Sequence, residues 1–75
     1  MQPDLELRAK LLDTARGVAA EHGWPWQEPI EVNSAAFKGE GVWEVVTNRM
    51  VRGASVRVLI RRSDGQVVHS GFLSR

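Results

Sequence analysis

The sequence predicts an α+β fold in which one N-terminal helix packs on a four-stranded antiparallel sheet, in the order α-β-β-β-β. Two observations lead to this prediction. Segment 5–22 places its apolar residues at helical spacing, and the later segments alternate apolar and polar residues between turn-forming sequences. A chain of 75 residues has room for one domain, which we expect to span residues 1–75.

The helix expected at Leu5–His22 is amphipathic. At about 100° per residue, one side of it collects the apolar residues and one histidine, namely Leu7, Leu11, Leu12, Ala15, Val18, Ala19 and His22. Gln2 or Asp4 can cap its start, and Gly23 is expected to end it in the left-handed conformation. Gly17 weakens the helix and predicts a close approach to another element.

The segment after the helix, Gly23-Trp24-Pro25-Trp26, is a rigid aromatic connector. Two indole rings around a proline either close the end of a core or form a platform on which a ligand stacks. In a domain of this size such rings more often close the core. Trp24 and Trp26 are therefore a candidate lid or ligand site.

Three strands can be assigned bounds from alternation and turn signals, at Ile30–Phe37, Val42–Asn48 and Ala54–Arg62. The third is the clearest, because β-branched residues alternate with arginines between two turns. The first is expected to loosen after Ser34. A fourth strand is expected to follow the turn Ser63-Asp64-Gly65.

Burying the apolar residues suggests a register for each hairpin. A loop centred on Met50 and Val51 predicts the opposite pairs Val45–Val56, Trp43–Val58 and Glu44–Arg57. The last of these would be an ion pair worth about 0.2 to 1 kcal/mol. A three-residue loop with Gly65 left-handed predicts the pairs Ile60–Val68 and Val56–Phe72, and is preferred to a two-residue Asp-Gly turn, which would set Ile60 against His69.

These registers leave one face of the sheet away from the helix. Leucine and valine residues share this face with arginines, a mixture suited to protein interfaces. We expect the partner-binding residues to be Glu44, Arg57, Leu59, Arg61 and His69.

Charge is unevenly distributed along the chain. Residues 1–44 carry a net charge of −4 and residues 45–75 a net charge of +5, although the whole chain has a formal net charge of only +1. The basic part contains the series Arg49, Arg52, Arg57, Arg61 and Arg62. Arginine pairs with carboxylate and phosphate. An acidic protein surface is the preferred partner and nucleic acid the alternative, because Trp43 and Phe72 are expected to point inward, away from any bases.

The sequence offers little for catalysis. It has no cysteine, and His22 and His69 lack the spacing at which two imidazoles meet one metal ion. Phosphate-loop, dinucleotide and serine-hydrolase motifs are also missing. We therefore expect a non-enzymatic protein with no cofactor and no metal site. Without an export signal or a membrane-spanning run in the sequence, we expect a cytoplasmic location, and exposed edge strands leave self-association open.

The segments Gly41-Val42-Trp43-Glu44-Val45 and Asp64-Gly65-Gln66-Val67, after an alanine-rich helix, resemble small bacterial cystatin-like α+β domains. The nearest patterns are PepSY-like domains and short NTF2-fold immunity-like proteins, and the resemblance covers Leu5 to Val68. It implies a helix wrapped by a curved sheet and a non-catalytic role as an inhibitor, immunity or regulatory domain. The chain lacks the export signal and acidity usual in PepSY-like domains, and the length and tyrosine of an NTF2-like enzyme. No catalytic residue is carried over.

Overall fold

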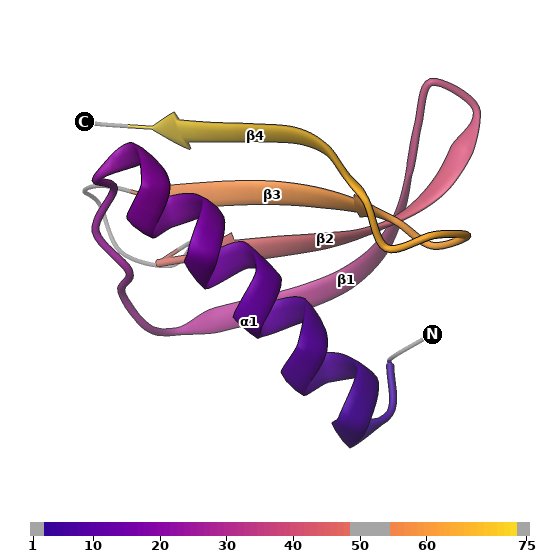
Figure 1. Cartoon of the computed structure of the whole chain (residues 1–75), viewed down its shortest axis with the longest axis horizontal. Helices are drawn as coiled ribbons and strands as arrows, with labels where there is room; N and C mark the ends of the chain where they lie inside the picture. Colours follow the sequence, from indigo (N-terminus) through magenta and orange to yellow (C-terminus); the bar gives the residue numbers. More distant parts are fainter. Residues whose placement is uncertain (1–2, 49–54, 74–75) are drawn as a thin grey trace.

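The computed structural model describes residues 3–48 and 55–73 of the chain. Its elements are α1 (Leu5–His22), β1 (Ile30–Phe37), β2 (Glu40–Thr47), β3 (Ser55–Arg61) and β4 (Val67–Leu73). The strands form one antiparallel sheet in the order β1-β2-β3-β4, and α1 crosses one of its faces (Figure 1). The expected α+β fold class and order of elements are confirmed.

α1 begins and ends where its sequence predicts. The Asp4 side chain accepts a hydrogen bond of 2.8 Å from the N–H of Leu7, whereas Gln2 lies outside the described residues. Gly23 adopts a φ of 71° and donates its N–H to carbonyls of the last turn, which is the glycine cap that commonly ends helices. The close approach expected at Gly17 is wrong, because no atom of another element lies within 4 Å of a Cβ placed there.

The main core lies between α1 and the sheet. α1 contributes Leu11, Ala15 and Ala19, and the two small alanine side chains let the helix lie close to the strands. The sheet contributes Val32, Trp43, Val45, Val56, Val58 and Ile60. The apolar faces predicted for the strands are thus confirmed, including the inward direction of Trp43, and Phe72 packs at the margin of the same core.

β1 and β2 form a long, regular hairpin. Every residue of β1 has a partner in β2, ending with Phe37 opposite Glu40, so the expected loosening after Ser34 is wrong. Lys38 and Gly39 join the strands with φ values of 52° and 82°. Positive φ at both central residues is typical of a two-residue type I′ turn, whose twist matches that of the strands.

The register between β2 and β3 differs by two residues from the expected one. Val45 lies opposite Val58, not opposite Val56, and the neighbouring pairs move in the same way. The loop centre predicted at Met50 and Val51 lies outside the described residues. Because side chains alternate with a period of two, a shift of two residues keeps each of them on its face. The pairing was wrong, but the faces were correct.

The register between β3 and β4 agrees with the prediction only far from their turn. Val56 lies opposite Phe72 as expected, but Ile60 lies opposite Val67 instead of Val68, and the pairing shifts at this point. An extra residue on one strand produces such a shift and increases the local twist.

The turn between β3 and β4 is one residue longer than expected. The N–H of Arg61 donates to the carbonyl of Gln66 at 2.8 Å, and the N–H of Gly65 donates to the carbonyl of Arg61 at 2.9 Å. The loop between the bonded residues Arg61 and Gln66 therefore contains four residues, 62–65. The left-handed conformation predicted for Gly65 is confirmed by its φ of 74°.

Candidate binding surface

The face of the sheet that α1 leaves uncovered, here called the outer face, is the surface on which the sequence placed its candidate residues. β2 contributes Glu44, β3 contributes Arg57, Leu59 and Arg61, and β4 contributes His69. Leu59 lies opposite Glu44 on one side and opposite His69 on the other. The five residues are therefore neighbours on one face, as predicted, although their surroundings differ.

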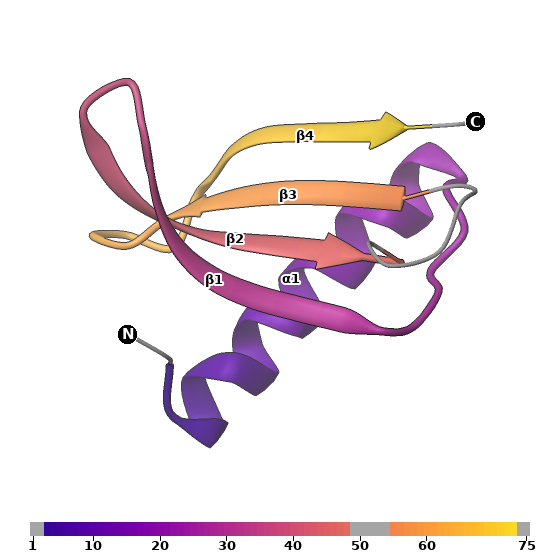
Figure 2. The ribbon, with the colours of Figure 1, turned by 180° about the vertical axis from the view of Figure 1, so that it is seen from behind.

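The hairpin of β1 and β2 bends over this face. Figures 1 and 2 show it rising out of the sheet beside the turn between β3 and β4. The ring of Phe37 on β1 lies 5.6 Å, centroid to centroid, from the imidazole of His69 on β4. In a flat sheet the two outer strands of four would lie about 14 Å apart. The sheet is therefore curved enough to bring side chains of its first and last strands into contact.

The middle of the outer face is buried. Leu59, Val42 and Val46 are exposed by only 1%, 0% and 5%, although their side chains belong to the face away from α1. The exposure expected for Leu59 is therefore wrong. The Leu59 side chain is part of the buried layer under the outer face and offers no surface to a partner, whereas Val67 is exposed by 38%.

Arg57 and Glu44 form the ion pair that the sequence predicted. The Nε of Arg57 lies 2.6 Å from Oε2 of Glu44, and the exposed fractions of the two side chains are 45% and 13%. The pair is diagonal, because Glu44 lies opposite Leu59 in the observed register. Since the hydrogen bond is made by Nε, the terminal amino groups of Arg57 can donate to a further acceptor.

Arg61 is held by two carboxylates. Its Nη1 lies 2.8 Å from Oδ2 of Asp64, and its Nε lies 3.3 Å from Oε2 of Glu40. The hydrogen bond from the N–H of Gln66, together with Arg61, lowers the pKa of Asp64 below its usual value, and the bond to Asp64 raises the pKa of Arg61. The positive charge of Arg61 is thus compensated within the domain.

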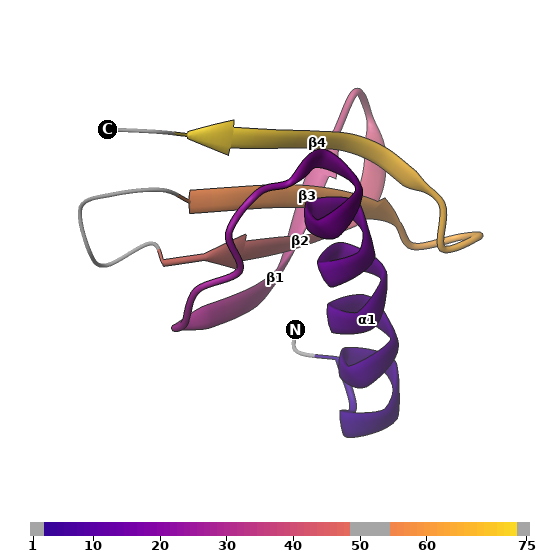
Figure 3. The same ribbon diagram turned by 60° about the vertical axis from the view of Figure 1, so that its left-hand side comes forward.

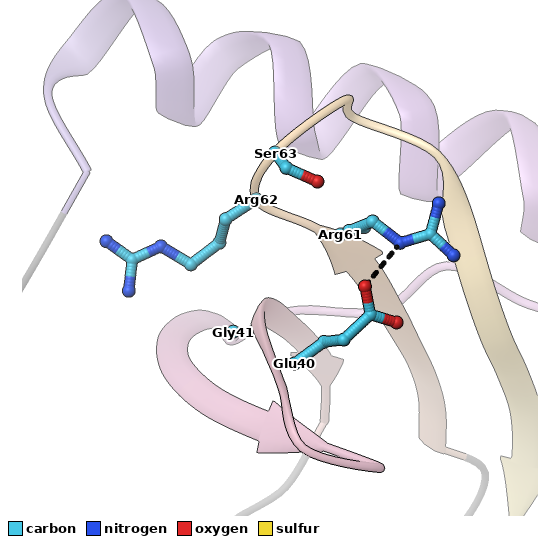
Figure 4. Close-up of a pocket in the computed structure, with 5 residues that line it drawn as sticks. All are labelled: Glu40, Gly41, Arg61, Arg62 and Ser63. Carbon is cyan, nitrogen blue, oxygen red and sulfur yellow. Dashed lines mark ion pairs between the residues drawn. The ribbon is translucent and has the colours of Figure 1, made fainter.

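Arg61 and Glu40 border an open pocket between the tips of the two hairpins (Figure 4). Its lining consists of Glu40, Gly41, Arg61, Arg62 and Ser63. Figure 4 shows Arg61 turned toward Glu40 and Arg62 pointing away from both. An anion entering here would meet the carboxylate of Glu40 as well as the arginines, so the lining does not favour a phosphate.

Arg62 serves the core instead of the outer face. Its guanidinium lies 4.5 Å from the centre of the Trp43 ring and donates to Oγ of Ser34 at 3.3 Å. This contact covers the face of a core tryptophan ring, a role that the sequence reasoning missed. Arg49 and Arg52, the other members of the arginine series, lie outside the described residues.

The two connector tryptophans have different surroundings. Trp24 stacks between His22 and Phe72, with centroid distances of 4.2 Å and 5.8 Å, which is the geometry of a lid at the end of the core. Trp26 is also half-buried against the core, but the guanidinium of Arg16 lies 5.7 Å from its ring centre. Its ring also lines a pocket beside α1.

Comparison with protein families, with curated proteins and with solved structures found no match for this chain. The resemblance to PepSY-like and immunity-like domains therefore stays a prediction. In the part of the chain that the structure describes, no group of three or more His, Cys, Asp or Glu side chains could hold a metal ion. Within the same ranges, no helix has the length and apolarity needed to cross a membrane.

Proposed function

We propose that this chain is a non-enzymatic protein-binding module, an inhibitor, immunity or regulatory domain, that contacts an acidic partner surface through its outer face. The observation that carries the proposal is the fixed position of Arg57. Its Nε is bonded to a carboxylate that is only 13% exposed, while its own side chain is 45% exposed. The proposed contact residues are Arg57, His69 and Arg61. Glu44 orients Arg57 through their ion pair, and the buried Leu59 packs beneath this surface.

The geometry supports a role in binding because an arginine that is already positioned loses less conformational freedom when it meets a partner. Ordering a flexible side chain costs about 0.5 to 1.5 kcal/mol on association. Glu44 has removed part of that cost for Arg57 by accepting a hydrogen bond from its Nε. Arginine at such a position is typical of interface hot spots.

The proposal is tested by affinity purification from the source cells with immobilised wild-type protein and variants. The double variant Arg57→Gln and His69→Ala should retain at least about tenfold less of a protein that the wild type binds specifically. This is the effect expected from losing two interface contacts. Lys10→Gln, which also removes a positive charge but lies on the exposed side of α1, should retain it fully. Equal retention by the double variant and the wild type would show that the outer face is not the contact surface.

Nucleic acid receives less support as a partner, because Trp43 and Phe72 pack in or against the core. Neither ring is therefore offered to bases for stacking. A fluorescence titration with a labelled duplex separates the two functions, since affinity for nucleic acid falls steeply with salt concentration. Strong, salt-dependent binding would favour nucleic acid over the proposed protein partner.

Self-association through an edge strand is a further way for the domain to bind protein. β1 and β4 form the two edges of the sheet, and an edge strand offers unpaired backbone groups to another chain. Sedimentation velocity over a range of protein concentrations tests this. A stable monomer at all concentrations would exclude pairing between copies and leave the partner as a different protein.

A further inference from the structure

A pocket on the helix side of the molecule combines positive charge with an apolar wall. One wall is a stripe of α1, with Arg8, Leu12 and Arg16 four residues apart, and the other includes Trp26 and Ile30. Figure 3 shows the connector leaving the end of α1 and descending away from the helix to the start of β1. The pocket encloses about 380 Å³, within the range of sites that hold small ligands or side chains.

The two arginines of this pocket differ from those of the outer face in having no carboxylate partner. Arg8 reaches the carbonyl of Ile30 at 3.5 Å, a long contact, and Arg16 lies over the ring of Trp26. Neither forms an ion pair with any acid in the described ranges. Glu28 is the one acid in the lining, so the pocket has a net positive charge.

The spacing of these groups suits a particular peptide. Arg8 and Arg16 are eight residues apart on a helix, which is about 12 Å along its axis. Two residues four positions apart in an extended chain are separated by about 13 Å and point to the same side, as does the residue midway between them. An acidic residue at each end would meet the arginines, and an apolar residue in the middle would meet Leu12 and Trp26.

We propose that this pocket binds an extended acidic segment of a partner protein, with two carboxylates paired to Arg8 and Arg16 and an intervening apolar side chain packed on Trp26. Tryptophan and arginine are the residues that most often dominate binding energy at interfaces. The site lies on the opposite layer from the outer face. It does not rest on the function proposed for that face and can be tested separately.

The test is an NMR titration of ¹⁵N-labelled full-length protein with a blocked pentapeptide of sequence Glu-Ser-Phe-Ser-Glu. The chain has three tryptophans, and the indole N–H signal of Trp26 is assigned from the variant Trp26→Phe. Saturable shifts of the Trp26 and Arg16 side-chain signals are expected, with the buried Trp43 indole unchanged. A peptide with glutamine in place of both glutamates should bind at least about tenfold more weakly, since two charge-assisted bonds are lost.

Variants in both directions sharpen the test. Arg16→Gln, which breaks no backbone contact, should weaken binding roughly tenfold, and Glu28→Gln should strengthen it by removing a competing carboxylate. Lys10→Gln is the matched control and should change affinity by less than about twofold, because an exposed charge on the other side of the helix is screened. The amide spectrum of each variant reports whether it is folded.

Several results would overturn the proposal. Equal binding of the glutamine peptide, or an equal effect of Lys10→Gln and Arg16→Gln, would show that specific carboxylate pairing is absent. Phenylacetate binding as tightly as the peptide would make this a small-carboxylate site. Shifts of Trp26 on changing the protein concentration alone would identify a second copy as the occupant, and peptide shifts confined to Arg57 and His69 would move the contact to the outer face.

Discussion

Replacing Leu59 by alanine tests the most consequential feature of this fold, the bend of the β1–β2 hairpin over the outer face. Sequence periodicity alone puts Leu59 on a solvent-exposed face, where truncation changes the free energy of unfolding by less than about 0.5 kcal/mol. The structure leaves it 1% exposed. The two readings therefore predict clearly different stabilities for one variant.

The expected magnitude follows from burial and from what covers the site. Leucine to alanine in a core costs about 2 to 5 kcal/mol, depending on how far the surroundings collapse into the space. Leu59 lies opposite His69, whose ring contacts Phe37, and side chains this near the surface can shift into the space that a truncation leaves. We therefore expect a loss of about 2 to 3 kcal/mol, near the lower end of that range.

Urea unfolding followed by tryptophan fluorescence measures the loss. With a denaturant dependence of about 1 kcal/mol per molar for so small a domain, the midpoint should fall by about 2 to 3 M. Leu5→Ala is the matched control, because it makes the same chemical change at a residue that is 87% exposed. Its unfolding free energy should stay within about 0.5 kcal/mol of the wild type.

Equal midpoints for Leu59→Ala and Leu5→Ala would refute the reasoning, because the outer face would then be open at Leu59. A second variant separates the bend from other causes of burial. Phe37→Ala removes the ring that reaches β4 and should destabilise the protein by about 1 kcal/mol or more, since a half-buried aromatic side chain loses its packing.

Three further predictions concern local features. Gly17→Ala should raise the free energy of unfolding by up to about 1 kcal/mol, because no atom of another element lies within 4 Å of the added Cβ. A melting temperature below that of the wild type would instead indicate the close approach that the sequence suggested. Asp4→Ala should lower the free energy of unfolding by about 1 kcal/mol, because it removes the hydrogen bond from the N–H of Leu7. At the denaturation midpoint of the wild type, the variant should therefore contain less helix by circular dichroism. Equal helix content would show that Asp4 does not stabilise the helix. Asp64 has a lowered pKa in the folded state, so its contribution to stability is complete above the unfolded value of 3.8 and is lost as the pH falls through the folded value. Asp64→Asn should therefore lose less stability than the wild type when urea midpoints are compared between about pH 6 and pH 3, and parallel pH profiles would contradict the assignment.

Most of the fold was predictable because its signals are local. The apolar stripe of α1, the glycine at its end and the alternation of the strands each depend on residues close in sequence, and the structure confirms all three. The turn lengths and registers were less predictable. The hairpin after β2 was shifted by two residues, and the bulge opposite Ile60 leaves no mark in a pattern of apolar residues, because several pairings bury the same side chains.

The candidate surface was predictable as a set of neighbours but not in its burial or charge. Alternation placed Glu44, Arg57 and His69 on one face, and the Glu44–Arg57 pair formed despite the wrong register, since a diagonal contact is still within reach of two long side chains. Leu59 was misjudged because it faces away from α1. The contact of Phe37 with His69 could not be predicted, because in the sequence Phe37 is only an aromatic residue beside a turn.

By itself, the sequence determined which residues form each element and which side each residue faces, because these properties follow from the periods of helix and strand. Only the tertiary structure decided that the sheet bends until Phe37 meets His69, and that Leu59 is buried while Arg57 stays exposed. It also decided which arginines have acidic partners and which do not. The physical reason is that curvature and ion pairing depend on distances between strands and helix, and residues far apart in the chain set those distances only when they pack together.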